Sequence, residues 1–274
     1  MLIPDEEFTE RLQDTIKPWV KEHLKEEYFT SYDGTKIHTH YAIHPQEKAS
    51  IVISHGFCEF AGKFHEVMYY MYTMGYSVFF IEHRGHGFSD RAACIHEWDR
   101  VYVKNYDEYV EDMHGFIEKI VKKRSLTHTY YLYAHSMGIL RWDLKYVPGQ
   151  KGFNHVYVFK TSSSTSEPRY AYIFNQREET PQYTSYGGTY AWTRASIYAT
   201  RKIARNADKV KIPVLLCQAG KDTMVRPEGQ EYFAEHSKNT RLIRFPESKH
   251  ELFTATYDIM LPYYKEVFDF YAEK

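Results

Sequence analysis

One stretch of the sequence decides the fold: Tyr130-Tyr131-Leu132-Tyr133-Ala134-His135-Ser136-Met137-Gly138. Residues 129–133 are β-rich and predict a buried strand, whereas the residues after Gly138 suit a helix. Between them lies a small-x-Ser-x-small pattern, with Ala134 and Gly138 as the small residues. This pattern is typical of the nucleophile elbow, a strained strand-to-helix turn that exposes a serine hydroxyl. The alternative is a buried serine in an ordinary strand–helix loop.

Strands and helices alternate on both sides of this stretch. Continuous apolar runs predict buried strands at residues 50–54, 76–81, 214–218 and 241–245, and helical spacing predicts helices at 63–74, 106–123, 230–236 and from 257 onward. A helical pattern also covers residues 137–146. Such alternation predicts an α/β fold with a mostly parallel central sheet flanked by helices.

The first 44 residues precede this alternation. Residues 5–24 have apolar side chains at helical spacing, and residues 26–44 predict a hairpin that turns at Asp33-Gly34. His38 and His40 would share one strand face there. Two histidines two residues apart can bind a metal, but the sequence has no acidic or cysteine partner close by. We therefore interpret them as solvated strand histidines and expect no metal site.

The segment 147–206 is rich in aromatic residues and shows no clean period until a helix predicted at 192–204. We interpret it as a small cap inserted over the carboxyl ends of the strands, where open α/β sheets bind their ligands. The expected organisation is therefore a first core part at 1–146, the cap at 147–206, and a second core part at 207–274.

Composition excludes several classes of function. The chain has 274 residues and a net charge of −1, so bulk attraction to nucleic acid is not expected. Its three cysteines match no zinc pattern, and neither a signal peptide nor a membrane span is recognisable. We expect a cytoplasmic protein with reduced thiols and no cofactor.

Three residues could form a catalytic triad. A serine hydroxyl needs a base to take its proton, and the base needs an acid to orient it. Asp222 and His250 follow the last two predicted strands, in the chain order serine, acid, histidine that α/β-hydrolases use. Two backbone N–H groups, of Met137 and of Phe57, would stabilise the oxyanion. Alone, Asp222 or His250 could be an ordinary surface loop residue.

With these residues in order, the chain resembles the monoacylglycerol lipase and lysophospholipase branch of the α/β-hydrolase superfamily, specifically the bacterial lysophospholipase L2-like proteins. The matching stretches are His55-Gly56-Phe57-Cys58-Glu59, residues 82–90, His135-Ser136-Met137-Gly138, residues 218–222, residues 185–192 and Lys249-His250-Glu251. The resemblance implies hydrolysis of single-acyl lipid esters through an acyl-enzyme, with Ser136 as nucleophile, His250 as base and Asp222 as its orienting acid.

The chain departs from this family at two places. Ala134 replaces a usual glycine, and roughly forty residues are absent after the elbow, where the family has a long helix and another central strand. Either His155-Val156-Tyr157-Val158-Phe159 serves as that strand, or the sheet lacks it. A missing strand would shift Asp222 relative to His250, and small misplacements are costly in rate.

Three functions remain open from the sequence. The first is an esterase acting on a small lipid ester, whose cap could contact a membrane surface transiently. The second is a serine aminopeptidase of the same fold, which needs an acid such as Glu59 for the substrate amine. The third is a catalytically impaired binding protein, suggested by the short segment after Gly138.

Overall fold

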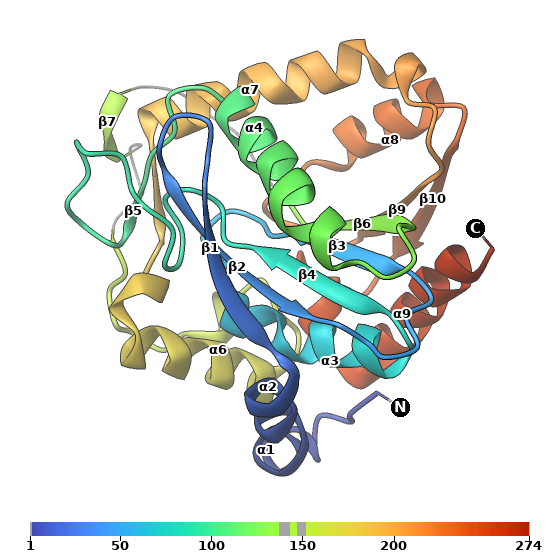
Figure 1. The fold of residues 1–274 in the computed structure, drawn as a ribbon. Helices are drawn as coiled ribbons and strands as arrows, with labels where there is room; N and C mark the ends of the chain where they lie inside the picture. Colours follow the sequence, from blue (N-terminus) through green and yellow to red (C-terminus); the bar gives the residue numbers. More distant parts are fainter. Residues whose placement is uncertain (1, 137–142, 147–151, 274) are drawn as a thin grey trace. The chain divides into compact units, whose positions relative to one another are not determined.

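The computed structural model describes residues 2–136, 143–146 and 152–273 (Figure 1). The chain divides into two compact units. The larger unit comprises residues Arg11–His155 and Asn175–Ile197, and the smaller unit comprises Met1–Glu10, Val156–Phe174 and Tyr198–Lys274. The segment 147–206 contributes to both units. We describe each unit by itself.

The larger unit contains a five-stranded sheet, in the order β1-β2-β4-β3-β6. Its strands are β1 (Lys25–Thr30), β2 (Lys36–Ala42), β3 (Ser50–Ser54), β4 (Ser77–Ile81) and β6 (Tyr130–Ala134). β3 pairs in parallel with β4 and β6, whereas β2 pairs antiparallel with β1 and β4. The expected hairpin turns at Asp33-Gly34, where Gly34 has a φ of +90°.

Helices cover both faces of this sheet (Figure 1). On one face, α4 (Asp107–Phe116) continues through η3 (Ile117–Val121) and α5 (Lys122–Arg124), and its Phe116 belongs to the same buried cluster as Phe79 of β4. On the other face, η2 (Ala61–Phe64) leads into α3 (His65–Thr73), and the Phe64 ring lies 5.1 Å from that of Phe80. Successive strand residues point to opposite faces, so β4 is buried on both sides and reads as a continuous apolar run.

The N-terminal helix and the predicted helix at 106–123 are confirmed. The first is a continuous run of α1 (Phe8–Arg11), η1 (Leu12–Ile16) and α2 (Lys17–His23), and it buries Phe8, Leu12, Ile16 and Trp19. None of the helices in the described part of the chain has the length and apolarity needed to cross a bilayer.

The larger unit also holds a small sheet of three short strands, in the order β5-β8-β7. These are β5 (Arg100–Val101), β7 (Asp143–Tyr146) and β8 (Gly187–Thr189). The short helix η5 (Pro181–Tyr183) precedes β8, and the helix α7 (Tyr190–Arg205) follows it. The helix expected over 137–146 is therefore wrong for 143–146, where β7 pairs antiparallel with β8. Residues 137–142 lie outside the described residues.

The smaller unit is built on two parallel strands, β9 (Val214–Ala219) and β10 (Thr240–Phe245). Their register pairs Ala219 with Phe245, so both strands end at the same level. The unit also contains η4 (Phe159–Thr161), η6 (Ala207–Lys209), α8 (Pro227–His236), η7 (Leu252–Thr254) and α9 (Tyr257–Ala272), while α6 (Glu167–Glu179) continues from this unit into the larger one.

The structure decides between the two explanations of the short segment after the elbow. Residues 155–158 form no strand and Phe159 begins η4, so this stretch does not replace the missing strand. In the described ranges, β9 pairs only with β10, and β6 is the last strand in the order of the larger sheet. Among the described residues, no strand pairs with both β6 and β9, so the strand expected between the serine and the acid is not found there.

A second correction concerns the hairpin histidines. His38 and His40 are 1% and 2% exposed, so they are not solvated. The His40 ring lies 6.0 Å from that of Phe80, its pairing partner on β4, and the His38 ring lies 5.5 Å from that of Phe88 in the loop that follows β4.

Candidate active site

Ser136 lies two residues after the end of β6, in the larger unit. The ladder between β3 and β6 continues one step beyond the strands, because the His135 N–H donates to the Ser54 carbonyl at 3.1 Å. At Ser136 the backbone turns into the left-handed region, with a φ of +47°. This region is unfavourable for a residue with a Cβ atom, and it is the strained turn that the elbow pattern predicts.

The loop after β3 lies against this turn. A Cβ atom on Gly56 would stand 3.0 Å from the Ser136 Cβ and 3.0 Å from the His135 carbonyl oxygen. Only glycine allows so close an approach, which brings the Gly56-Phe57 backbone beside the candidate nucleophile. The Phe57 ring lies 3.9 Å from the Trp192 ring, between centroids. The role of the Phe57 N–H as an oxyanion donor stays a prediction, and Met137 lies outside the described residues.

Glu59 connects this loop to the elbow. One carboxylate oxygen accepts the Gly56 N–H at 2.5 Å and is 3.1 Å from His135 Nδ1, and the other accepts Lys63 Nζ at 2.7 Å. Burial alone would raise the Glu59 pKa, but His135 and Lys63 hold it well below its ordinary value. The side chain is therefore a buried carboxylate that orients both the loop and the residue before Ser136. Sequence reasoning considered Glu59 only as an amine ligand and missed this role.

Asp222 and His250 lie together in the smaller unit. The loops after β9 and β10 are joined by two backbone hydrogen bonds, Gly220 N to Phe245 O at 2.9 Å and Lys221 N to Ser248 O at 2.8 Å. Across this junction, Asp222 Oδ2 is 2.8 Å from His250 Nδ1. With its proton on Nδ1, the imidazole presents Nε2 as a base.

The backbone fixes the Asp222 carboxylate from its other side. Its Oδ1 accepts the N–H groups of Met224 at 2.7 Å and Val225 at 3.0 Å. Burial would raise the Asp222 pKa, but the hydrogen bonds from His250 and from these N–H groups outweigh it and lower the pKa below its ordinary value. Asp222 therefore stays ionised at neutral pH, as an acid that orients a histidine must.

Glu251 holds the loop that carries His250. It accepts hydrogen bonds from the Ser163 hydroxyl and, at 2.9 Å, from the Thr254 hydroxyl, and its N–H donates to the Ser163 carbonyl at 3.1 Å. From the sequence alone, Glu251 stands out only as part of the Lys249-His250-Glu251 stretch. No local signal could identify Ser163 as its partner, because it lies 88 residues earlier in the chain.

The close packing at Gly220 makes a first prediction. A Cβ atom there would stand 2.4 Å from the Pro246 carbonyl oxygen, so Gly220→Ala must separate the two loops. We expect about 1–3 kcal/mol of destabilisation and a drop in kcat of about 100-fold, because a shift of about 1 Å between catalytic groups has that cost. Urea unfolding and ester-hydrolysis rates measure the two effects.

Gly229 in α8 supplies the matched control, since a Cβ atom added there meets nothing within 4 Å. Gly229→Ala should leave kcat unchanged and stabilise the protein by about 0.5–1 kcal/mol, because alanine is the better helix former. Equal rates in both variants would contradict the proposed function of the Gly220 contact.

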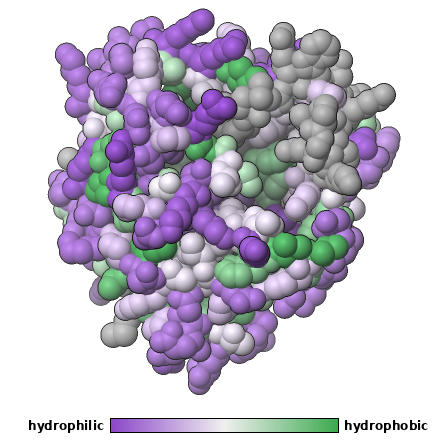
Figure 2. Space-filling view, turned by 180° about the vertical axis from the view of Figure 1, so that it is seen from behind, coloured by the Kyte–Doolittle hydropathy of each residue, from purple (hydrophilic) through white to green (hydrophobic). Residues whose placement is uncertain are grey.

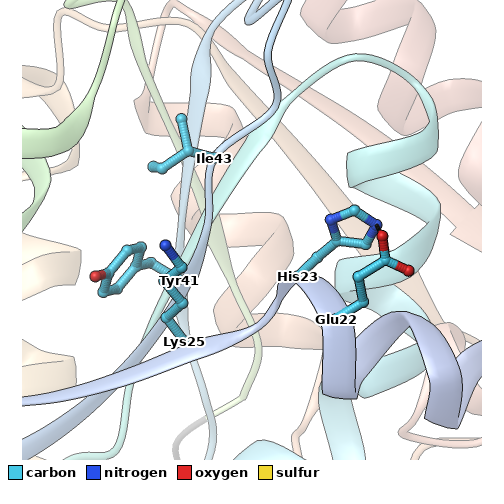
Figure 3. Close-up of a pocket in the computed structure, with 5 residues that line it drawn as sticks. All are labelled: Glu22, His23, Lys25, Tyr41 and Ile43. Carbon is cyan, nitrogen blue, oxygen red and sulfur yellow. Dashed lines mark ion pairs between the residues drawn. The ribbon is translucent and has the colours of Figure 1, made fainter.

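The larger unit has two surface cavities. The first, about 220 Å³, is lined by residues of α2, β1 and the end of β2 (Figure 3), namely Glu22, His23, Lys25, Tyr41 and Ile43. The second, about 170 Å³, is lined by residues between Phe88 and Trp98. The face shown in Figure 2 is largely hydrophilic, with separate apolar patches. None of the candidate catalytic residues lines either cavity.

Comparisons with known proteins identify the family. The family model described as "Serine aminopeptidase, S33" matches residues 45–144 and 153–256. A probable lysophospholipase L2 of Haemophilus influenzae is 22% identical over 84% of this chain and 87% of its own length. Lysophospholipase L2 of Escherichia coli K12 is 25% identical over 68% of this chain and 67% of its own.

A solved structure shows the same fold. The crystal structure of a soluble variant of the monoglyceride lipase of Saccharomyces cerevisiae superposes with a TM-score of 0.71, at 14% identity, over 91% of this chain and 94% of that one. At this identity the likeness concerns the fold. Because the family model covers well over half of the chain, the protein belongs to the Hydrolase_4 family, serine aminopeptidase S33, and is a hydrolase with the α/β-hydrolase fold.

Proposed function

We propose that this protein is a serine hydrolase that cleaves the carboxylic esters of single-acyl lipids, in the manner of a lysophospholipase or monoacylglycerol lipase. The observation that carries the proposal is the Asp222–His250 hydrogen bond of 2.8 Å, since the same chain holds Ser136 at a left-handed φ of +47°. The lipid ester as substrate is supported by the lysophospholipases among its relatives.

In this mechanism Ser136 attacks the ester carbonyl while His250 Nε2 takes the hydroxyl proton. Asp222 holds the imidazole in the correct tautomer and stabilises the imidazolium that forms. The oxyanion accepts hydrogen bonds from the backbone N–H groups of Phe57 and Met137, and Glu59 positions the loop that carries the first of them. His250 then protonates the departing alcohol. A water molecule then gives a proton to His250 and attacks the carbonyl carbon of the acyl-enzyme. The bond to Ser136 Oγ breaks, His250 returns the proton to Oγ, and the fatty acid is released.

We propose that residues 147–206 act as the cap that receives the acyl chain. Three aromatic rings of this segment cluster in the smaller unit, with 5.0 Å between the centroids of Tyr157 and Tyr170 and 5.4 Å between those of Tyr157 and Phe174. Val156, Tyr157 and Val158 form an exposed run, 54%, 42% and 41% accessible. An exposed apolar run beside an aromatic cluster suits transient contact with a membrane surface. We place the enzyme in the cytoplasm, where its three free cysteines stay reduced.

The alternative activity, aminopeptidase, is suggested by the description of the family. It requires an acid that is available to bind the substrate's free amine. Glu59, the acid considered for this role, already has three hydrogen-bond partners in Gly56, His135 and Lys63. This observation favours the esterase.

A comparison of substrates tests the proposal. We expect the purified protein to release fatty acid from a monoacylglycerol or from lysophosphatidylcholine, and to hydrolyse p-nitrophenyl esters at least about 100-fold faster than aminoacyl p-nitroanilides; a factor of 100 corresponds to about 2.7 kcal/mol of transition-state stabilisation. Faster cleavage of the anilides would favour the aminopeptidase, and cleavage of neither substrate would favour a binding protein.

A further inference from the structure

Three potential metal ligands lie on one face of the β1–β2 hairpin. Glu26 of β1 stands directly opposite His40 of β2 in the strand register, and His38 lies two residues before His40 on the same face. One ligand atom from each of the three side chains lies within 4.8 Å of the others. Sequence reasoning found no acidic partner for the two histidines, because Glu26 reaches them only through the pairing of the strands.

His40 is buried without a hydrogen-bond partner. It is 2% exposed, and neither ring nitrogen has such a partner among the described residues. Burial, with smaller effects from His38 and His65, holds its pKa well below the ordinary value, so the ring is a neutral imidazole. Buried polar groups are normally paired, and a neutral imidazole that lacks a partner offers a lone pair to a metal ion. The Nδ1 atom lies 3.8 Å from Glu26 Oε1.

His38 is oriented by a second carboxylate. Its Nδ1 lies 2.9 Å from Oε2 of the fully buried Glu82, which also accepts the N–H groups of Ala61 at 3.0 Å and Phe88 at 2.7 Å. A carboxylate is an acceptor, so it favours the proton on Nδ1 and leaves the lone pair on Nε2. That Nε2 lies 3.4 Å from Glu26 Oε2. Such a carboxylate behind a histidine is the usual outer partner of a metal-binding imidazole.

We propose that Glu26, His38 and His40 form a binding site for a divalent transition-metal ion, with Zn²⁺ as the representative ion. Two imidazole nitrogens and one carboxylate oxygen suit this ion, and in a tetrahedral site with bonds of about 2.0–2.1 Å the ligand atoms lie about 3.4 Å apart. The separation of 3.4 Å between Glu26 Oε2 and His38 Nε2, and that of 3.8 Å between Glu26 Oε1 and His40 Nδ1, approach this spacing. The Glu26 side chain is 66% exposed, so the fourth position opens to water.

The ion would join β1 to β2. It would bring the buried imidazole of His40 and the carboxylate of Glu26 on the neighbouring strand into one coordination sphere. It would also lie between the Nε2 lone pair of His38 and the Glu26 oxygen, which otherwise face each other. Because none of the three residues belongs to the candidate active site, the bound ion acts on stability and takes no part in ester cleavage.

Titration of the full-length, chelator-treated protein with Zn²⁺ tests the proposal. We expect one tight site by calorimetry and a rise in Tm of roughly 5–10 °C when Zn²⁺ exceeds its Kd by about 100-fold. Glu26→Gln and His40→Phe should each weaken binding at least about 10-fold and remove the Tm rise. His40→Phe places another ring beside Phe80, so it keeps the apolar packing, and circular dichroism confirms folding.

Glu27→Gln is the matched control. It removes the same charge one residue along the same strand, on the opposite face, where Glu27 pairs with Arg124. This variant should bind Zn²⁺ as the unmodified protein does. The proposal is overturned if no tight site is found, if all variants bind equally, or if Glu26→Gln changes the metal-free Tm while Zn²⁺ has no effect. The last result would mean that Glu26 stabilises the hairpin through its direct contacts with the histidines and not through a metal ion. Hydrolysis of p-nitrophenyl acetate by Glu26→Gln should be unchanged, which separates this test from that of the proposed function.

Discussion

Replacing Ser136 by alanine should reduce ester hydrolysis by roughly 10⁴- to 10⁶-fold, because the nucleophile that forms the acyl-enzyme is removed. A fluorophosphonate probe should label the unmodified protein at Ser136 and leave the variant unlabelled. Intact-mass spectrometry followed by peptide mapping measures both outcomes. The residual rate is expected to come from binding and oxyanion stabilisation alone.

The backbone at this position allows a sharper version of the test. Ser136 has a φ of +47°, which glycine adopts without the penalty that a Cβ atom brings. Ser136→Gly should therefore lose activity as completely as the alanine variant does, yet be more stable than that variant by about 1 kcal/mol. Ser162→Ala, which removes a partly buried hydroxyl in the smaller unit, should keep both activity and labelling. Labelling that persists in Ser136→Ala would place the nucleophile elsewhere.

Replacing Asp222 by asparagine is expected to lower kcat by about 10⁴-fold while KM changes little. The carboxylate oxygen 2.8 Å from His250 Nδ1 favours the proton on that nitrogen. An asparagine that turns its NH₂ group toward the ring favours the opposite tautomer, in which Nε2 carries the proton and cannot act as a base. Steady-state kinetics with a p-nitrophenyl ester measures the change.

Glu247→Gln is the control for this prediction. It neutralises an exposed acid in the loop before His250, where Glu247 pairs with Lys221, and it should change kcat by less than about twofold, since exposed ion pairs contribute little. If Asp222→Asn kept more than a tenth of the activity, Asp222 would not be the residue that orients the catalytic base.

Local sequence patterns predict much of this fold. The strands at 50–54 and 241–245 and the long helix near 106–123 are continuous apolar runs or amphipathic spacings, and each lies within about two residues of its expected bounds. The local pattern predicts a helix at residues 143–146, whereas β7 forms there, because its strand conformation depends on pairing with β8, more than forty residues later. Pairing across such distances leaves no trace in a short window of sequence.

The candidate site likewise contains residues that the sequence predicts and residues whose roles appear only in the folded structure. The order of Ser136, Asp222 and His250 is readable because an α/β-hydrolase places each residue just after a strand. The contacts of Glu59 are not readable, since its partners Gly56 and His135 meet only in the folded loop. The burial of His38 was likewise hidden, because an alternating strand does not reveal what covers each of its faces.

The buried histidines beside the elbow have a consequence for the acid limit of the enzyme. His55, His83 and His86 lie together, with ring centroids 4.6 and 5.0 Å from His55, and burial lowers the pKa of His83 to about 4 and that of His86 to about 3. In the unfolded chain each would bind a proton near pH 6.5, so stability is greatest above that pH and falls as the pH drops toward 4. At about pH 4, the folded pKa of His83, this residue alone lowers the free energy of unfolding by about 3 kcal/mol. Loss of activity in mild acid, ordinarily assigned to protonation of the catalytic base, would then report unfolding, and circular dichroism recorded across the same pH range would reveal it.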